Sequence, residues 1–461
     1  MPRRSLIGLA LMLAVVATAV AGLACSASAP RLPPADTAAA PPPRTPLLGI
    51  VGGRRQQQLA RIDPATLRAR PGPRIGVGSE GCASSTRGSA CWGIPPWSFS
   101  PDRRMLAVAR HDGGMPRSLR IVDVGRMRVR EDLPIVGGAV GLVAWPTRER
   151  LLMLQDICCG ERQQLVVVDV RRRRFVARRA LEGTIQRVAR TARRLVLLLS
   201  PAKAVGPARL VVADARGTLR SVVLERLPAG VKVVSETDYR VRMNVPGLAV
   251  DADGRRAFVV GPGLVAEIDL DDLRVSYHEL RASTSLLARL RDWLEPPASA
   301  KSVSGPTRTA RWLGGGLLAV AGSDQAVVGD GSRVRAAGLR IVDTRDWTTR
   351  TVDRDASDVR VAGDVLLATG SSWEPAAEEP DAIGLVAYGL DGRRRYRRFG
   401  GREAWIGQVF AGRAYVDVVE PRSRSIAVRV VDLGSGRVRR GARSGAVPWL
   451  LLAPAYGRWD E

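Results

Sequence analysis

One sequence unit recurs along almost the whole chain: an apolar strand that ends in aspartate, a tight turn, and a strand rich in arginine. The copies occupy residues 59–70 (LARIDPATLRAR), 119–130 (LRIVDVGRMRVR), 165–176, 210–221, 265–276, 339–350, 385–396 and 428–439. Self-similarity at a spacing of roughly 40 to 50 residues is typical of a propeller or another array of four-stranded units. The repeat therefore constrains the architecture, and it leaves the ligand and any reaction open.

Each unit reads as four short strands, which in the second unit are residues 97–100, 105–109, 119–124 and 128–133. The short connections leave no room for crossover helices, so each unit should be an antiparallel meander, and closing the meanders into a ring protects their edges. The first unit (47–77) lacks an innermost strand, and the segment 447–453 (VPWLLLA) offers a spare one. We predict an all-β propeller of four-stranded blades, eight by this count or seven if one weak unit is misread, closed by the C-terminal strand.

The N-terminus has the order of an export signal. Arg3 and Arg4 precede an apolar run that reaches Ala24 and is followed by Cys25 and small residues, as in a secretory signal peptide. Residues 21–25 (AGLAC) resemble the lipobox of bacterial lipoproteins, which implies lipidation of Cys25, although Gly22 departs from the aliphatic residue of that pattern. Ordinary cleavage with secretion and an uncleaved membrane anchor are the alternatives. All three place the rest of the chain outside the cytoplasm.

We predict three parts: a signal peptide with a lipobox (1–25), a spacer (26–46) and a single propeller domain (47–456). The spacer is rich in proline and alanine, and its prolines deny it helical and sheet hydrogen bonds, so we expect a disordered, extended tether. Within the propeller, residues 285–294 (SLLARLRDWL) have apolar side chains at helix-like spacing and stop at Pro296-Pro297. This segment predicts a helical insertion packed on the outside of the ring.

The formal net charge of +26 suggests the hypothesis that the protein binds nucleic acid. Lys203, Lys232 and Lys301 are the only lysines, so nearly all the positive charge is arginine, and it is spread through every repeat rather than gathered in one block. A GC-biased genome also produces a chain heavy in Arg, Ala, Val and Gly. We therefore expect a solvated basic surface and no specific nucleic-acid partner.

The stretches 99–107 (FSPDRRMLA) and 250–259 (VDADGRRAFV), each followed by a strand that runs into Val-Asp or Ile-Asp, resemble blades of the WD-repeat-like, YVTN-type and quinoprotein-like β-propellers. The resemblance covers most of the chain from Leu47 onward. It implies the fold and almost nothing about function, because the shared residues close turns and fill sheet interfaces. The repeats carry neither the Trp-Asp dipeptide of WD repeats nor the regular Trp docking motifs of quinoprotein blades.

Four cysteines besides Cys25 predict two disulfides in an oxidising compartment: Cys82, Cys91, Cys158 and Cys159. The first two lie in the loop that enters the second blade, and Cys158 and Cys159 lie in the turn between the middle strands of the third. These two kinds of loop open on the same face of a propeller, so disulfides could join the two loops. Alternatively, a local Cys82–Cys91 bridge would leave Cys158 and Cys159 as a vicinal pair. A vicinal disulfide lies against the cofactor in quinoprotein alcohol dehydrogenases. We favour structural bridges, and we expect no cofactor and no metal.

Motifs of common enzymes are missing from the sequence. It has no Gly-x-Ser-x-Gly elbow, no phosphate loop and no His-Glu-x-x-His helix. Its two histidines are His111, in a predicted turn with Asp112, and His278, at a strand end, where we expect a structural role. The carboxylate pairs Asp271-Asp272 and Asp251/Asp253 are better explained as turn formers than as a glycan-cleaving pair.

One acidic loop, residues 371–381 (SSWEPAAEEPD), stands out from the basic background and should open on the same face as the cysteine loops. The candidate recognition face comprises Trp92, Trp97, His111, Trp373, Glu374, Glu378, Glu379 and Asp381. Aromatic anchors beside acidic groups are typical of a protein or glycan-binding surface, and a solvated loop with an incidental Trp is the alternative.

We therefore expect an extracytoplasmic, membrane-tethered β-propeller that acts as a binding or scaffolding module, with an unidentified protein or glycan ligand on the loop face. The main alternative is an enzyme of the same fold, either a quinone-dependent dehydrogenase or a glycan-acting hydrolase or lyase. Carboxylates or arginines that converge at the central channel would favour the enzyme, whereas a dry, apolar channel would favour the module.

Overall fold

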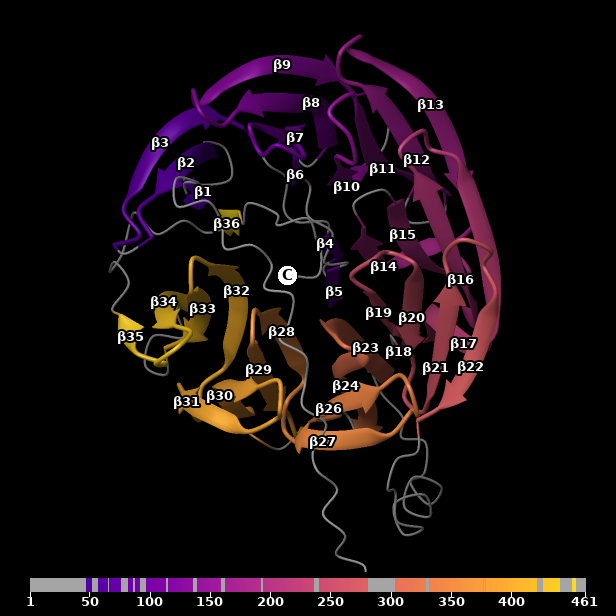
Figure 1. Ribbon diagram of the computed structural model, residues 1–461, viewed down its shortest axis with the longest axis vertical. Coiled ribbons are helices and arrows are strands. Elements are labelled where there is room, and N and C mark those ends of the chain that lie inside the picture. Colours follow the sequence, from indigo (N-terminus) through magenta and orange to yellow (C-terminus); the bar gives the residue numbers. More distant parts are fainter. Residues whose placement is uncertain are drawn as a thin grey trace, which may run out of the picture. The chain divides into compact units, whose positions relative to one another are not determined.

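Four-stranded antiparallel meanders follow one another along the chain and form a ring, as in a β-propeller (Figure 1). The computed structural model describes residues 47–452 except 52–56, 65, 76–81, 86–87, 92–96, 113–114, 136–138, 159–161, 192–193, 236–239, 281–302, 329–330, 376, 378, 421–425 and 440–449. The predicted signal peptide (1–25), the predicted spacer (26–46) and the predicted helix at 285–294 lie outside the described residues. All the regular structure in the described part is β.

The first four blades, each numbered from its innermost strand outward, are as follows. Blade 1 is β36 (Leu450–Leu452), β1 (Leu47–Val51), β2 (Gln58–Ile62) and β3 (Ala69–Arg74); blade 2 is β6 (Trp97–Phe99), β7 (Met105–Asp112), β8 (Met115–Asp123) and β9 (Arg128–Pro134). Blade 3 is β10 (Ala139–Ala144), β11 (Arg150–Cys158), β12 (Arg162–Asp169) and β13 (Arg174–Leu181); blade 4 is β14 (Thr184–Arg190), β15 (Arg194–Ser200), β16 (Val205–Asp214) and β17 (Leu219–Ser235).

The next four blades repeat this order. Blade 5 is β19 (Gly247–Val250), β20 (Arg256–Val260), β21 (Leu264–Asp269) and β22 (Val275–Glu279); blade 6 is β23 (Val303–Gly314), β24 (Leu317–Val328), β26 (Leu339–Asp343) and β27 (Thr349–Asp353). Blade 7 is β28 (Asp358–Ala362), β29 (Val365–Ser372), β30 (Asp381–Gly389) and β31 (Arg394–Arg398); blade 8 is β32 (Ala404–Phe410), β33 (Arg413–Val419), β34 (Ile426–Asp432) and β35 (Val438–Arg439).

The C-terminal strand closes the ring, as the sequence predicts. Strand β36 pairs antiparallel with β1, with Leu48 opposite Leu452 and Ile50 opposite Leu450. The first blade thus takes its innermost strand from the other end of the chain. Because β1 would otherwise be an unpaired edge, this pairing protects the blade against association through that edge.

Six blades are separate sheets, and blades 4 and 6 belong to one ten-stranded sheet. Strand β17 is 17 residues long and continues past its blade into a hairpin with β18 (Arg240–Asn244), which pairs in parallel with β23. A second hairpin extends β24 to β25 (Gly331–Ala336). Six separate four-stranded blades are therefore present in the described part of the chain, against the eight that the repeat predicts, because the two meanders that we number as blades 4 and 6 share one sheet.

The recurring aspartate of the sequence unit is a turn former. In blades 5 and 6, the side chains of Asp269 and Asp343 accept hydrogen bonds from the main-chain N–H groups of Asp271 (2.7 Å) and Arg345 (3.0 Å). The residue four positions after the aspartate has a positive φ, as at Leu273 (62°). This Asx turn reverses the chain between the third and fourth strands, so the repeat reflects backbone geometry and not chemistry of a site.

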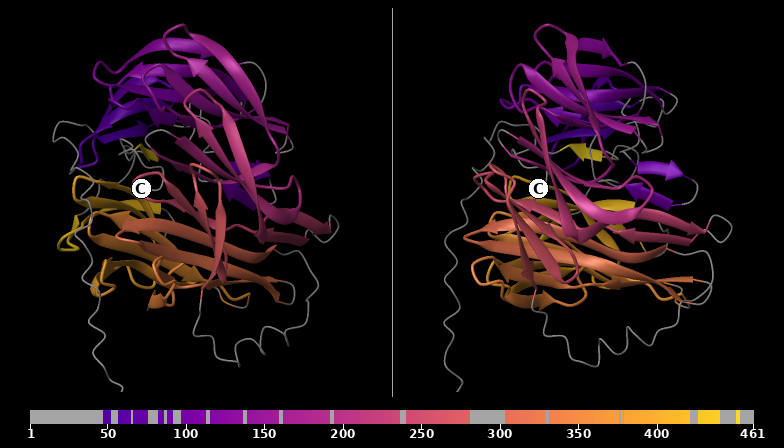
Figure 2. Two further views of the ribbon diagram at one scale, coloured as in Figure 1. Left: turned by 45° about the vertical axis from the view of Figure 1, so that its right-hand side comes forward. Right: turned by 90° about the vertical axis from the view of Figure 1, so that its right-hand side faces the viewer.

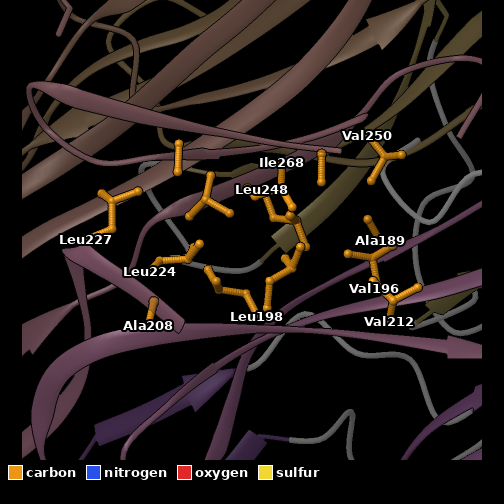
Figure 3. Close-up of a cluster of buried hydrophobic side chains, with 14 of the residues drawn as sticks. Ala189, Val196, Leu198, Ala208, Val212, Leu224, Leu227, Leu248, Val250 and Ile268 are labelled. Atoms are coloured by element: carbon orange, nitrogen blue, oxygen red, sulfur yellow. The ribbon is translucent and has the colours of Figure 1, made fainter. Parts of the chain in front are cut away.

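Apolar side chains fill the interfaces between blades. Between blades 4 and 5, Leu198, Leu224, Leu248 and Ile268 are almost completely buried in one cluster (Figure 3). Alternate residues of each strand point to opposite faces, so each central sheet has one set of side chains for each neighbouring blade. Packing between faces of the sheets therefore holds the ring together.

Two local predictions need correction. His111 and Asp112 are not in a turn, because the pairing of β7 with β8 continues through a bulge until Asp112 lies opposite Met115. Cys82 and Cys91 are not in an irregular loop: they belong to a two-stranded sheet formed by β4 (Cys82–Ser85) and β5 (Gly88–Cys91). In both places strands with paired main chains occupy segments that we predicted to be loops, because these segments are rich in residues that favour turns.

Candidate functional site

One end of the ring carries the longest connections. Four antiparallel strands alternate in direction, so the links between second and third strands and the links between successive blades lie at the same end. We call this end the loop face. The hairpins β17–β18 and β24–β25 are such links, and Figure 2 shows them extending beyond the blades on one side.

Exposed apolar side chains gather at this end. Six large hydrophobic side chains are exposed in the described part of the chain, and five of them belong to strand ends or connections at the loop face: Val233, Val234, Trp373, Trp405 and Ile426. The sixth, Val176, lies on the outermost strand of blade 3. These five side chains come from blades 4, 7 and 8, so they make that end of the ring a candidate contact surface.

Trp373 is held in place by the neighbouring blade. Its N–H donates to the carbonyl of Val334 (2.7 Å), and its own carbonyl accepts from the Val334 N–H (2.9 Å), so the β29–β30 loop is attached to the β24–β25 hairpin. The indole remains 38% exposed. An aromatic side chain on a fixed backbone loses little conformational entropy on binding, which suits it to act as an anchor.

Charged groups flank this tryptophan. Glu374 lies 2.7 Å from Arg333 Nε and 3.5 Å from an Arg335 nitrogen. The hydrogen bond from Arg333, followed by the charges of both arginines, lowers the pKa of the Glu374 carboxyl. Glu374 is therefore an ionised partner in a bridge between two blades, and the bridge further fixes the position of Trp373.

The other residues of the predicted recognition face are placed as follows. Glu379 and Asp381 are exposed in the same loop as Trp373, with Asp381 as the first residue of β30. Trp97 begins β6 at the loop-face end and is partly buried in the core between blades 1 and 2. His111 lies near the loop-face end of β7. Trp92 and Glu378 lie outside the described residues.

The cysteines occupy loop-face connections. Cys82 stands directly opposite Cys91 in the β4–β5 hairpin, and Cys158 is the last residue of β11, opposite Arg162. Cys159 and Cys25 lie outside the described residues. This register concerns the main chain, and both disulfide connectivities that the sequence allows stay predictions.

A second group of polar residues lies on the inner wall, which we define as the innermost strands of the blades. Three of these strands carry arginines: Arg187 and Arg190 on β14, Arg308 and Arg311 on β23, and Arg360 on β28. Two pairs of these arginines have an Arg-x-x-Arg spacing in the sequence, in the segments 187–190 and 308–311. This spacing was not predicted as a site, because arginine is usually a surface residue. The described inner wall is therefore not purely apolar.

Two of these arginines have side-chain hydrogen bonds to other strands. Arg308 donates through Nη1 to Asp324 Oδ1 (2.7 Å) and to the carbonyl of Ser323 (3.1 Å). Arg190 donates to Ser98 Oγ (3.3 Å) on the innermost strand of blade 2. Burial, followed by the charge of Arg103, lowers the pKa of Arg190 to about 10. Arg308 is thus held within blade 6, whereas Arg190 links the inner strands of blades 4 and 2.

His278 has the structural role that the sequence predicts for it. Its ring stacks on Trp347 of blade 6 at 3.7 Å between centroids, and Nε2 lies 3.2 Å from Glu267 Oε2 without hydrogen-bond geometry. Glu267 also pairs with Arg256 at 3.0 Å. These contacts join blades 5 and 6, and they belong to the packing between the two sheets.

The described residues contain no candidate metal centre and no candidate membrane-spanning helix. No group of three or more His, Cys, Asp or Glu side chains there could hold a metal ion. No helix in that part of the chain is long and apolar enough to span a membrane.

No family model matches this sequence, and no curated protein matches it. Among solved structures, the chain is similar to dihydro-heme d1 dehydrogenase NirN in complex with DHE, with a TM-score of 0.51, 14% identity, and coverage of 91% of this chain and 76% of that chain. It is also similar to the β-propeller domain of Cps50 (Swd1) from Myceliophteria thermophila, with a TM-score of 0.37, 15% identity, and coverage of 72% and 95%. At such identities the first of these likenesses supports the β-propeller fold and nothing further.

Proposed function

We propose that this protein is an extracytoplasmic β-propeller, tethered to the membrane through Cys25, that binds a partner protein or glycan on its loop face. The observation that carries the proposal is the concentration of exposed apolar side chains at that end, with Trp373 fixed by its main-chain bonds to Val334. Aromatic anchors in rigid surroundings supply most of the free energy of many interfaces. The polar and charged groups around Trp373 would set register and specificity.

Site-specific photo-crosslinking in the cell that exports the protein tests this proposal. A photo-reactive phenylalanine analogue at Glu379, which is exposed in the loop of Trp373, should give one discrete adduct. Adding Trp373→Ala should weaken that adduct strongly, because loss of an anchoring tryptophan lowers affinity by roughly 30-fold or more. Melting of the purified variant should be unchanged, since the indole is not part of the core.

The matched control places the photo-reactive residue at Arg393, whose side chain is 91% exposed in the β30–β31 turn at the opposite end of the ring. We expect no adduct there. Equal adducts at both positions, or an adduct at residue 379 that Trp373→Ala leaves intact, would overturn the assignment of the loop face.

The tether has its own test. Exported Cys25→Ser protein should leave the membrane fraction or stay unprocessed, because one residue would carry the whole attachment. Unchanged membrane association of a correctly exported Cys25→Ser variant would contradict lipidation and point to an uncleaved anchor.

The second candidate function is an enzyme of the same fold, and the arginines of the inner wall favour it. Such residues could hold an acidic glycan or an anionic quinone cofactor at the centre of the ring. Incubation of the purified protein with an acidic polysaccharide should then release new chain ends, and addition of a quinone cofactor should support reduction of a dye. Neither activity is expected if the protein is a binding module.

A further inference from the structure

The chain enters the ring at the end opposite to the loop face, which we call the entry end. Strand β1 is the second strand of blade 1 and its link to β2 lies at the loop face, so β1 begins at the entry end. Its first residue, Leu47, stands opposite Ile62, the last residue of β2. The predicted spacer (26–46) directly precedes Leu47 in the sequence. A tether at Cys25 would therefore join the ring at its entry end.

A run of four arginines, residues 171–174, lies at the entry end of blade 3. The first three belong to the turn between β12 and β13, the third and fourth strands of the blade, and Arg174 is the first residue of β13. All four residues are exposed. Asp169 accepts a hydrogen bond from the Arg172 N–H (2.8 Å), so the Asx turn of the repeat fixes the main chain that presents these side chains.

Three of these arginines have no counter-ion in the described part of the chain. Arg173 pairs with Glu131 of blade 2 at 2.8 Å. The side chains of Arg171, Arg172 and Arg174 have neither an ion pair nor a hydrogen bond among the described residues. Their guanidinium groups are therefore available to an anion from outside the protein.

The matching turn of blade 7 shows the difference. It also carries exposed arginines, but Arg393 lies 3.7 Å from Asp391, and Arg395 lies 2.6 Å from Asp364. In blade 3 the carboxyl of the turn, Asp169, is almost completely buried. One buried carboxylate cannot neutralise three exposed guanidinium groups, so the charge of this turn remains uncompensated.

Contacts between blades bring further arginines to the same end of the ring. Arg148 in the β10–β11 turn lies 3.8 Å from Asp102 in the β6–β7 turn, and both Arg148 and Arg126, in the β8–β9 turn, are largely exposed. Arg61 of blade 1 donates to the carbonyl of Gly125 in that same turn. Blades 1, 2 and 3 are consecutive in the ring (Figure 1), so their entry-end turns form one extended basic surface.

We propose that Arg171, Arg172 and Arg174 bind the anionic lipid headgroups of the membrane that holds the tether. The inference rests on the proposed tether at Cys25, because the tether keeps the entry end near the membrane. Arginine binds phosphate oxygens through parallel N–H donors, and basic groups are attracted to anionic lipid surfaces. A tether alone leaves the ring free to turn. Contact of the entry end with the headgroups would direct the loop face away from the membrane, towards its partner.

Vesicle binding by exported, processed Cys25→Ser protein tests these arginines apart from the tether, because this variant has no lipid on residue 25. The anionic probe is a vesicle of equal parts phosphatidylglycerol and phosphatidylcholine, and the neutral probe is phosphatidylcholine alone. We expect the protein to cosediment with the anionic vesicles at an ionic strength of about 0.1 M and to be released at about 1 M, where charges are screened within about 3 Å. It should not cosediment with the neutral vesicles.

The triple variant Arg171→Gln, Arg172→Gln, Arg174→Gln should lower the partition coefficient on anionic vesicles by roughly 100-fold, because each arginine near such a surface contributes about fivefold. Arg173 is left unchanged because it pairs with Glu131. The same three positions changed to lysine should retain most of the binding, since the charge is kept. Melting of both variants should match the parent protein, because the three side chains have no partner among the described residues.

The matched control removes the same charge from the loop face: Lys203→Gln, Lys232→Gln and Arg242→Gln, at three exposed positions of blade 4 and its hairpin. It should bind anionic vesicles within about twofold of the parent, because its charges face away from the lipid. Photo-crosslinking reports the orientation. On anionic vesicles, a photo-reactive phenylalanine analogue at Arg148 should capture lipid, and the same analogue at Glu379 should not.

Three results would overturn the proposal. The first is a protein that binds anionic vesicles no better than neutral ones. The second is a loop-face control that loses as much binding as the triple variant, since general charge would then be responsible. The third is a protein that binds a double-stranded oligonucleotide but neither vesicle, which would assign the arginines to nucleic acid.

Failure of the tether is seen separately. Membranes of cells that export Cys25→Ser protein are washed at an ionic strength of about 1 M, which removes binding by the arginines. Cys25→Ser protein that remains after this wash has an uncleaved anchor, so lipidation fails whatever the vesicles show. Release by the wash, together with the predicted vesicle binding, supports both the tether and the basic surface.

Discussion

Single residues in the turns determine how the repeats reverse direction. The β6–β7 turn of blade 2 (FSPDRR) and the β19–β20 turn of blade 5 (VDADGR) have the same geometry, in which Arg103 donates its N–H to Ser100 (2.8 Å) and Gly254 to Asp251 (3.1 Å). Both residues have a φ of positive sign, 58° at Arg103 and 68° at Gly254. Glycine adopts this conformation without strain, whereas arginine does not.

We predict that Arg103→Gly stabilises the protein by about 1 kcal/mol, because it removes the strain of a left-handed residue. It also removes a positive charge that lowers the pKa of Arg190. Gly254→Ala is the reciprocal variant and should destabilise by about 1 kcal/mol or more, since its new Cβ would lie 2.9 Å from Thr191 Cβ. Chemical denaturation of both variants checks the pair, and a destabilised Arg103→Gly would contradict the shared geometry.

The turn aspartates should make stability depend on pH. A hydrogen bond from the Arg345 side chain is the largest cause of the lowered pKa of Asp343, and burial partly opposes it. A carboxyl whose pKa is lower in the folded state stabilises the protein above its unfolded pKa of about 3.9, and this stabilisation is lost as the pH falls through the folded value.

Asp343→Asn should therefore cost about 1 kcal/mol at neutral pH and progressively less as the pH falls towards about 2, because protonation of the wild-type carboxyl removes the part of its stabilisation that depends on charge. Urea unfolding at the two pH values measures both costs. A cost that does not change between them would show that the charge of Asp343 contributes nothing and that its turn hydrogen bonds alone matter.

At the scale of elements, the repeat predicts the strands well because apolar alternation and turn residues are local signals. In blade 2 the predicted strands 97–100, 105–109, 119–124 and 128–133 agree with β6 to β9 to within one residue at six of the eight strand ends. The same local signals could not reveal the parallel pairing of β18 with β23, because that pairing joins segments about 60 residues apart in the sequence. The last residues of β7 and the β4–β5 hairpin were predicted as loops, because Gly, Ser and Asp favour turns; these residues do not exclude strands.

In the candidate site, too, the residues that stand out locally could be predicted, whereas their contacts with other blades could not. Trp373 and Glu374 could be predicted, because a Trp and acidic residues stand out in a basic chain. Their fixing by Val334 and Arg333 could not, because those residues come from another blade. The inner-wall arginines were missed for a related reason: burial depends on the position of a strand within the ring, which composition does not reveal.

The β4–β5 hairpin leads to a prediction on disulfides. Directly opposite residues of an antiparallel pair have Cα atoms about 4.5 to 5.5 Å apart, which lies in the range of a disulfide. Since Cys82 and Cys91 are such a pair, we expect a local bridge in exported protein. Peptide mapping without reduction should recover residues 82 and 91 in one linked fragment, whereas a link from either to Cys158 or Cys159 would contradict the register.

At the scale of the whole molecule, closure decides whether this array of sheets is a ring. Blades 1 and 8 are the two ends of the array, and the core between them contains Leu47, Phe410 and Tyr415. Tyr415 also donates its hydroxyl to the carbonyl of Pro64 (3.1 Å). These contacts, together with the pairing of β36 with β1, hold the first and last repeats against each other, as the circular arrangement of the sheets requires.

The most direct test of this account is deletion of every residue after Ser444, which removes β36 and leaves β1 as an unpaired edge. We predict that the truncated protein aggregates or melts far below the full-length protein, and that a synthetic peptide with the sequence of residues 445–453 partly restores solubility. A truncated protein that stays soluble and unfolds cooperatively at the temperature of the full chain would contradict closure of the ring by its C-terminal strand.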